Sequence, residues 1–566
     1  MALLLGFLIL LPVFKPGTLR AEEPPYFAIR DARIVTVSGP VIEKGTVVIA
    51  KGLIVAVGAD ATIPPEAWVI DGKGLTVYPG LIDALTDLGL TAGAPAAPAV
   101  PGAAPSPPAR PQQISHGPED RPATTPWVNP ADELKPDDKR LETWRNAGFT
   151  SALTAPKAGI FPGQGAVINL AGERPGEMVV KSPATLDLTF QPMSGFANFP
   201  DSLMGVLAYI QQVFLDTNRY MQAEAIYEAH PRGLNRPAYD RAVLVINDTL
   251  RSGRPVLLPA NKAPQILRTL VVADRLAVHP ILYGAQQAYA VADTLAAKRV
   301  PVLVSLKWPA KEKDADPEAE ESLRDLRFRD RAPSTPAALQ KAGGKFAFYS
   351  DGLPSPKDVL KNAKKAIDAG LPADAALRAF TLSAAEILGV ADRLGSIEPG
   401  KIADLVIADG DLFNEKTKVK MTFVDGRRYE VHEPTRPTEP PTVKLSGKWK
   451  LSVNSPEGPQ EASADLSMAE NGDLSGTLTG LTGTIMSRLG TVSISNGWVS
   501  GNKFSFAVSI PMAGNPTDVT FSGTVEGNEM KGSASAAGAS FDFTGARPGD
   551  GRPASAGSSQ EADHAT

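Results

Sequence analysis

The sequence predicts an α/β protein built around a (β/α)₈ TIM barrel, with a composite β-sandwich from both flanks and a C-terminal all-β domain of lipocalin-like or sandwich type. Eight short apolar runs between residues 76 and 351 alternate in several places with helical stretches, as strands and helices do in such a barrel. Runs of alternating β-branched residues flank this region on both sides. The 566 residues are enough for about three or four domains.

Composition narrows the class of protein. Hydrophobic residues make up 43% of the chain and charged residues 21%, which is typical of a soluble globular protein. The formal net charge of −5 offers no basic surface, so nucleic acid is not expected as a partner. The chain has no cysteine, which excludes disulfides, thiolate metal ligands and a cysteine nucleophile. Neither composition nor charge indicates an oligomeric state.

The N-terminus has the features of an export signal, which we place at residues 1–21. The apolar run from Leu3 to Phe14 is shorter than the ~20 residues that span a bilayer, and a small-residue site follows that ends at Ala21. We therefore expect cleavage before Glu22, a periplasmic or extracellular protein, and no transmembrane span beyond the signal. The alternatives are an apolar N-terminal anchor or a wrongly assigned start, and the lack of Lys or Arg before the run weakens the assignment of a signal.

Two segments far apart in the chain predict one small β domain. Residues 27–77 contain alternating apolar runs separated by turn signals, but they lack the mass of a full domain. Residues 393–431 supply further short strands. We expect the two segments to form the composite β-sandwich, with the barrel, residues 78–392, inserted between them.

The eight strand candidates of the barrel lie in TVYPGLIDAL, FTSALTA, GAVINLAG, MVVKSPATL, PVLLPA, HPILYGA, VPVLVSL and KFAFYSD. An Ala/Pro-rich insertion, residues 92–127, follows the first of them and is expected to be extended or disordered. Because it follows the first strand, it leaves from the mouth where a substrate would enter. It is either a passive loop or a lid.

Four stretches of the chain carry a family pattern. They are GLTVYPGLIDA, FPGQGAVINLAGERPGEMVVKSP, FYSDG and LSAAEILGVADRLGSIEPGKIADLVIADGD. Together they resemble the amidohydrolase superfamily, nearest to its imidazolonepropionase-like branch, over residues 27–431. The most specific part is the closing signature, residues 395–405. The resemblance implies a barrel that uses a divalent metal to hydrolyse a carbon–nitrogen bond, other than a peptide bond, in a cyclic amide, amidine or related small molecule.

The positions at which the resemblance implies metal ligands carry other residues. Positions i and i+2 of a strand share a face, and Asp83, Leu85 and Asp87 do so here. The family's His-x-His pair falls on Leu85, which has no lone pair, and on Asp87, which is a hard oxygen donor. The fifth- and sixth-strand histidine positions fall near Asn261 and on Tyr283. The metal-ligand motif is therefore degraded.

The five histidines of the chain lie elsewhere. Their places are a Pro-rich loop, the residue before a proline, the start of a strand, the beginning of a linker and the tail; they are His116, His230, His279, His432 and His564. A strand start is the non-catalytic end of such a barrel. We therefore predict no metal site and no cofactor.

Asp351 matches the family's last-strand aspartate, which the resemblance implies activates the attacking water. The alternative is that Asp351 caps the following turn, because one carboxylate without a metal is a weak hydrolytic device. Lys181 could stand for a carbamylated bridging lysine or be a solvated or salt-bridged side chain. Asp83, Asp87 and Asp351 could form an oxygen-only site for a hard cation such as Ca²⁺ or Mg²⁺.

Two functions of different classes remain open. The first is an exported amidohydrolase-type hydrolase, with Asp351 as the catalytic candidate. The second is a catalytically inactive relative that binds a small molecule or a partner protein. In either case we expect Asp83, Asp87, Asn261 and Tyr283 to be the substrate- or ligand-binding candidates at the mouth. Fold alone does not choose between these functions.

The last part of the chain predicts a separate β domain. After a Pro-rich linker, residues 433–442, residues 443–547 form a run of hairpin-like segments typical of a small antiparallel barrel or sandwich. Trp449 near the start and Arg547 at the end are faintly similar to the lipocalin-like pattern, in which a Trp closes the barrel floor. Such a barrel holds a small apolar ligand or only fills its own core. Residues 548–566 are expected to be a disordered tail.

The export hypothesis yields the first testable prediction. N-terminal sequencing of protein secreted by the native host should find a mature chain that begins near Glu22, because the apolar run ends in a small-residue cleavage site. Soluble cytosolic protein with Met1 still in place would contradict the prediction.

Overall fold

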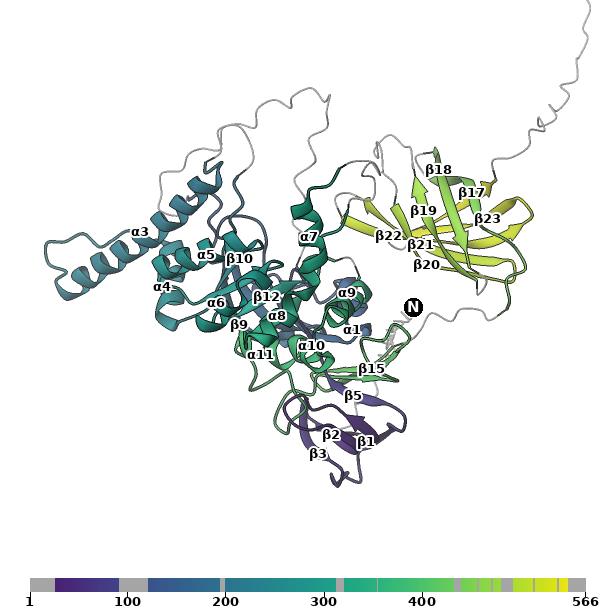
Figure 1. Ribbon diagram of the computed structural model, residues 1–566, viewed down its shortest axis with the longest axis horizontal. Helices are drawn as coiled ribbons and strands as arrows, with labels where there is room; N and C mark the ends of the chain where they lie inside the picture. Colours follow the sequence, from purple (N-terminus) through teal and green to yellow (C-terminus); the bar gives the residue numbers. More distant parts are fainter. Residues whose placement is uncertain are drawn as a thin grey trace, which may run out of the picture. The chain divides into compact units, whose positions relative to one another are not determined.

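The computed structural model describes two compact units, one up to Val431 and one from Glu439 onward (Figure 1). The described residues are 26–90, 121–193, 199–311, 320–353, 355–431, 439–455, 458–469, 472–479, 492–512, 515–536 and 539–547. The expected signal, most of the Ala/Pro-rich insertion, most of the linker and the tail lie outside them. No helix in the described part of the chain is both long and apolar enough to span a membrane.

The first sheet is assembled from both flanks of the barrel. Its strands are β1 (Tyr26–Ile34), β2 (Ile42–Ala50), β3 (Leu53–Gly58), β4 (Trp68–Asp71), β5 (Thr76–Pro79), β14 (Leu405–Ala408), β15 (Val419–Val424) and β16 (Arg427–Glu430). They follow the order β16-β15-β14-β5-β1-β2-β3, with β4 paired to β1. The antiparallel pair β5–β14 joins the two flanks. The expected division of these strands into the two layers of a sandwich stays a prediction.

The second sheet is the barrel. Its strands are β6 (Leu81–Thr86), β7 (Phe149–Thr154), β8 (Gly163–Asn169), β9 (Val179–Asp187), β10 (Val256–Ala260), β11 (Pro280–Gly284), β12 (Val302–Ser305) and β13 (Phe346–Tyr349). They lie side by side in sequence order, so the eight predicted strands and the α/β class are confirmed. The first predicted strand is divided at Gly80 between β5 and β6. A Cβ at Gly80 would lie 1.9 Å from Thr150 Oγ1, so the close approach of the chains there requires glycine.

One strand departs from the expected (β/α)₈ pattern. β8 runs antiparallel to both β7 and β9, whereas the other neighbouring strands of this sheet are parallel. The physical reason is that the connection between β7 and β8, residues 155–162, is too short for a parallel return, which needs a crossover of about a dozen residues or more. The strict (β/α)₈ prediction is therefore wrong at this strand. As a result Gly163, the first residue of β8, pairs with Asp187, the last residue of β9, at the barrel mouth.

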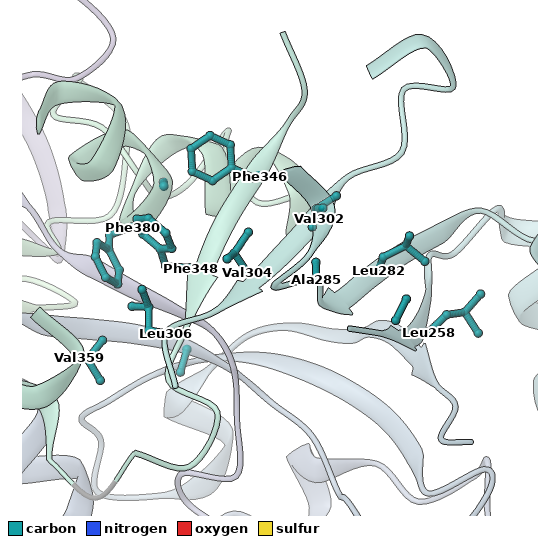
Figure 2. Packing of buried hydrophobic residues seen from close by; sticks show 14 of the residues in the cluster. Leu258, Leu282, Ala285, Val302, Val304, Leu306, Phe346, Phe348, Val359 and Phe380 are labelled. Atoms are coloured by element: carbon teal, nitrogen blue, oxygen red, sulfur yellow. The ribbon is translucent and has the colours of Figure 1, made fainter. Parts of the chain in front are cut away.

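Helices pack against the barrel sheet, most of them on its outer face and the last of them against inner-face residues such as Leu257 and Leu303. They are α1 (Lys139–Asn146), α2 (Pro175–Met178), α3 (Leu203–Ala229), α4 (Arg241–Ser252), α5 (Ala263–Leu276), α6 (Ala292–Ala297), α7 (Leu323–Arg331), α8 (Thr335–Lys341), α9 (Pro356–Asp368), α10 (Ala373–Phe380) and α11 (Leu382–Leu388). Figure 2 shows strand residues such as Val304 and Phe348 together with helix residues such as Val359 and Phe380. All four are fully buried, so this layer supplies the main hydrophobic stabilisation of the unit.

The closing signature joins the barrel to the composite sheet. Asp404 is buried, and its Oδ2 accepts a hydrogen bond from Ser151 Oγ of β7 at 2.7 Å. Its Oδ1 accepts from the backbone N–H of Asp425 at 2.8 Å. Desolvation raises the pKa of Asp404 to about 6 despite these bonds. The most specific part of the family resemblance is therefore a structural joint.

The second unit is a closed antiparallel barrel, the first of the two predicted alternatives. Its strands are β17 (Gly447–Ser455), β18 (Gly458–Met468), β19 (Asp473–Thr479), β20 (Val492–Ser500), β21 (Lys503–Met512), β22 (Asn515–Glu526), β23 (Glu529–Ala536) and β24 (Ala539–Ala546). Each strand pairs with the next, and β17 pairs with β24 to close the ring.

The two ends of this domain meet at Trp449. Its side chain is fully buried, its Nε1–H donates to the carbonyl of Leu445 at 2.9 Å, and the Arg547 guanidinium lies 4.8 Å from the ring centre. Phe506 packs against Phe521, and Phe521 against Phe543, each pair with ring centres 5.1 Å apart. These aromatic side chains fill part of the interior, and a cavity of about 680 Å³ lined by Leu451, Ala462 and Met530 also lies in this domain, so both alternatives for the barrel stay predictions.

The hydrophobic core of this barrel predicts independent folding. A fragment of residues 443–547 should show β-sheet circular dichroism and unfold in one cooperative transition. Trp449→Ala should lower its free energy of unfolding by about 3–5 kcal/mol, because it removes a fully buried aromatic side chain. The exposed neighbour Lys448 provides the control, since Lys448→Ala should change little. A fragment without a sheet signal would contradict the prediction.

Candidate functional site

Two adjacent pockets open at the barrel mouth and share Tyr283, Tyr349 and Asp351 as lining residues. The wider pocket has a volume of about 500 Å³ and the smaller one about 190 Å³. The wider pocket is mostly apolar, and the smaller one contains Asp187 and Lys157. Because the mouth of such a barrel is where its ligands bind, these pockets are the candidate site.

Asp83 is buried at the seam between the first and last strands of the barrel. Only 1% of the residue is exposed, and its Oδ1 accepts hydrogen bonds from the backbone N–H groups of Ser350 at 3.0 Å and Leu85 at 3.4 Å. Its Oδ2 has no hydrogen-bond partner. Desolvation raises its pKa to about 7. Asp83 therefore serves the closure of the barrel, and it does not line either pocket.

Leu85 and Asp87 occupy the positions of the family's His-x-His pair. Leu85 is half-buried and contributes apolar surface to the smaller pocket. Asp87 lies directly after β6 between two cations, with its Oδ1 3.2 Å from Arg140 Nη1 and its Oδ2 3.4 Å from Lys157 Nζ. Both carboxylate oxygens of Asp87 are thus engaged in ion pairs.

Asn261 and Tyr283 both line the wider pocket, and both already have partners. Asn261 Nδ2 donates to Gln286 Oε1 at 3.2 Å, and its Oδ1 accepts from the backbone N–H of Gln286 at 3.0 Å. The Tyr283 hydroxyl donates to the carbonyl of Leu188 at 3.3 Å. Desolvation, followed by the negative charges of Asp187 and Asp351, raises the pKa of Tyr283, so its hydroxyl stays protonated.

Asp351 lies at the mouth and lines both pockets. Its Oδ2 accepts a hydrogen bond from Ser305 Oγ, at the end of β12, at 2.8 Å. Its backbone has a φ of 52°, in the left-handed region that non-glycine residues rarely adopt. Strained residues of this kind cluster at binding and catalytic sites, which supports a role for Asp351 in the site.

Asp187 is a site residue that sequence reasoning missed. It ends β9, is 5% exposed, and lines the smaller pocket. Its Oδ1 accepts from Thr185 Oγ1 at 2.8 Å, whereas its Oδ2 has no hydrogen-bond partner. Desolvation raises its pKa to about 7. The available signal was a carboxylate in the last position of a barrel strand, where such folds place their functional residues.

Lys181 lies near the start of β9, away from the mouth. Its Nζ donates to the carbonyls of Leu388 at 3.1 Å and Gly389 at 3.2 Å, at the end of α11. The structural alternative for Lys181 therefore fits its position, although its partners are carbonyls and not an acid. His230 and His279 are exposed, and His279 precedes β11 at the opposite end of the barrel; the remaining three histidines lie outside the described residues.

These residues do not fit a divalent metal. A zinc site needs about three protein ligands that converge with free lone pairs. In the described part of the chain no three His, Cys, Asp or Glu side chains are placed to hold one ion. The oxygen-only alternative is also not assembled, because Asp83 faces Ser350, Asp87 faces two cations and Asp351 faces Ser305.

The similarities to known proteins agree with this fold. Residues 303–429, which run from β12 to β16, match the family model described as Amidohydrolase family. An amidohydrolase from Thermotoga maritima MSB8 is similar to 71% of this chain over 100% of its own, with 26% identity and a TM-score of 0.58. Residues 303–429 are therefore similar to the amidohydrolase family; the assignment of the chain to the imidazolonepropionase-like branch stays a prediction.

Two further solved structures are similar to this chain at lower identity. One is a prolidase complexed with N-methylphosphonate-L-proline, with 17% identity over 72% of this chain and 99% of its own, and a TM-score of 0.45. The other is a zinc-bound adenosine deaminase from Xanthomonas campestris, with 18% identity over 72% of this chain and 93% of its own, and a TM-score of 0.40. No curated protein matches the chain.

The buried carboxyl of Asp187 yields a stability prediction. Its pKa is 3.8 in an unfolded chain and about 7 in the folded protein, so the folded state keeps a proton that the unfolded state releases. Stability should therefore fall as the pH rises from about 4 to 7. Since one pKa unit corresponds to about 1.4 kcal/mol, ionised Asp187 costs on the order of 4 kcal/mol.

Asp187→Asn should accordingly raise the free energy of unfolding at pH 8 and have little effect near pH 4. Urea denaturation of the full chain at both pH values measures this difference. Asp60→Asn removes the same charge from an exposed turn and should change neither value. An Asp187→Asn variant that is less stable than the wild type at pH 8 would contradict the prediction that the ionised, buried carboxylate destabilises the folded protein.

Proposed function

We propose that the barrel is a metal-free binding module that holds a small organic molecule at its mouth. The observation that carries the proposal is the pairing of Asp87 with both Arg140 and Lys157. At the position where the family resemblance implies a metal ligand, two positively charged side chains contact the carboxylate of this chain. The proposed activity is therefore recognition of a ligand without metal-assisted hydrolysis.

Electrostatics supports this proposal. Two unit charges about 4 Å apart interact with about 4 kcal/mol at an effective dielectric constant of about 20. A divalent cation bound by Asp87 would be repelled by Lys157 and, less strongly because Arg140 also pairs with Asp138 at 2.8 Å, by Arg140, and it would also have to break the existing ion pairs. Leu85 offers it no lone pair in return.

The mouth nevertheless keeps the features of a ligand site. Pockets that bind small molecules commonly have volumes of about 300–1,000 Å³ and mostly apolar walls with a few polar groups. The wider pocket, about 500 Å³, has this character, with Phe190 and Val272 on its apolar side and Gln286 and Ser305 on its polar side. Loss of the metal chemistry therefore leaves a cavity that can bind.

A weak hydrolase is the second candidate function. The position of Asp351 favours it, because this residue lies at the mouth and is oriented by Ser305. A positioned carboxylate acting alone as a general base contributes about 10²–10⁴-fold. This contribution by itself falls far short of the acceleration of a typical enzyme.

Metal content and turnover, measured on the same preparation, test the proposed function. We expect substoichiometric zinc and no turnover of a panel of cyclic amides. Leu85→His combined with Asp87→His should not create activity, because Asn261 and Tyr283 still occupy the other ligand positions. His116→Ala tests the histidine that follows the first strand, and it should not change the metal content. Stoichiometric zinc in the wild type, with turnover lost in Asp351→Asn, would overturn the proposal.

A further inference from the structure

We infer that the ligand of the mouth is an organic cation, a primary amine or amidine with an apolar tail. Its charged group would lie in the smaller pocket between Asp187 and Asp351, and its tail in the wider pocket. This inference rests on the proposed function. It adds the chemical class of the ligand that the metal-free mouth would recognise.

The first support is the unpartnered oxygen of Asp187. Nearly all buried polar groups in proteins have a hydrogen-bond partner, and one that lacks a partner requires an explanation. Asp187 is 95% buried, its Oδ1 is occupied by Thr185, and its Oδ2 is free while the residue lines the smaller pocket. A donor brought in by a ligand would satisfy this oxygen, and a charged donor would do so most strongly.

The second support is the second carboxylate with its aromatic neighbours. Asp351 lines the same pocket. Ser305 Oγ donates its hydrogen bond to Asp351 Oδ2, so this bond does not use Asp351 Oδ1. Tyr283 and Tyr349 line the pocket too, with ring centres 6.5 Å apart in an edge-to-face arrangement. Aromatic faces next to carboxylates attract ammonium groups, and the negative charges of Asp187 and Asp351 already act on the Tyr283 hydroxyl.

The cations around the site do not oppose this assignment. Lys157 lines the smaller pocket, but its Nζ is 3.4 Å from Asp87 Oδ2, so that carboxylate offsets part of its charge. Arg268 lines only the wider pocket, from the exposed side of α5. The described carboxylates that face the smaller pocket are Asp187 and Asp351, which favours a cation over an anion there.

The sizes of the two pockets divide the ligand into two parts. The smaller pocket, about 190 Å³, suits an ammonium or amidinium group. The wider pocket, about 500 Å³, presents Phe190, Leu207 and Val272, which suit an aliphatic or aromatic tail. A molecule with a charged head and an apolar tail therefore matches both pockets at once.

Calorimetry on the full chain at pH 8 tests the inference with three probes of equal length: 4-phenylbutylamine, 4-phenylbutanol and 4-phenylbutyrate. The amine should bind, and the alcohol and the acid should bind at least about tenfold more weakly. Asp187→Asn should weaken binding of the amine by about ten- to a hundredfold, the range for a lost hydrogen bond to a charged group, without changing binding of the alcohol. Asp60→Asn should have no effect on either.

Three results would overturn the inference: equal binding of amine and alcohol, unchanged amine binding in a folded Asp187→Asn variant, or no amine binding at millimolar concentration. Equal binding of amine and alcohol would leave the proposed binding function intact. The proposed function fails on a separate observation, namely stoichiometric zinc together with turnover in the same preparation. Failure of the inference and failure of the function can therefore be told apart.

Discussion

The hydrogen bond from the backbone N–H of Ser350 to Asp83 Oδ1 is the contact on which the architecture of the mouth depends. The described residues of β6 and β13 form no backbone ladder with each other, so this side-chain bond spans the seam of the barrel. Ser350 lies between Tyr349 and Asp351, and its anchoring fixes two residues that line both pockets. The bond requires a buried carboxyl with one unpartnered oxygen, which is unfavourable when ionised.

The closing signature, which is the most specific part of the resemblance to the amidohydrolases, holds the fold together. Asp404, in the closing signature, binds Ser151 and the backbone of residue 425, at the joint between the two sheets. The family match over residues 303–429 includes Asp404 and Asp351 but not the strands of Leu85 and Tyr283. A family resemblance of this kind therefore indicates a shared fold, while function depends on the residues at the mouth.

The sequence predicted the eight barrel strands because each is a short apolar run, and it predicted the C-terminal barrel from its alternating hairpins. It did not predict the reversal of β8, since the signal is the length of connection 155–162 and not the strand itself. Asp187 was missed because a single acidic residue at a strand end is common, and its burial follows only from the packing of the barrel. The pairing of Asp87 with Arg140 joins residues far apart in the chain, so only the fold reveals it.

The central claim is that the side chains of Arg140 and Lys157, and not a metal ion, neutralise Asp87. An anomalous-difference map from crystals grown with millimolar zinc tests it most directly. The account predicts no zinc peak at the mouth, with Asp87 in contact with Arg140 and Lys157. A zinc peak about 2.0–2.2 Å from a carboxylate oxygen of Asp87, Asp187 or Asp351 would contradict it.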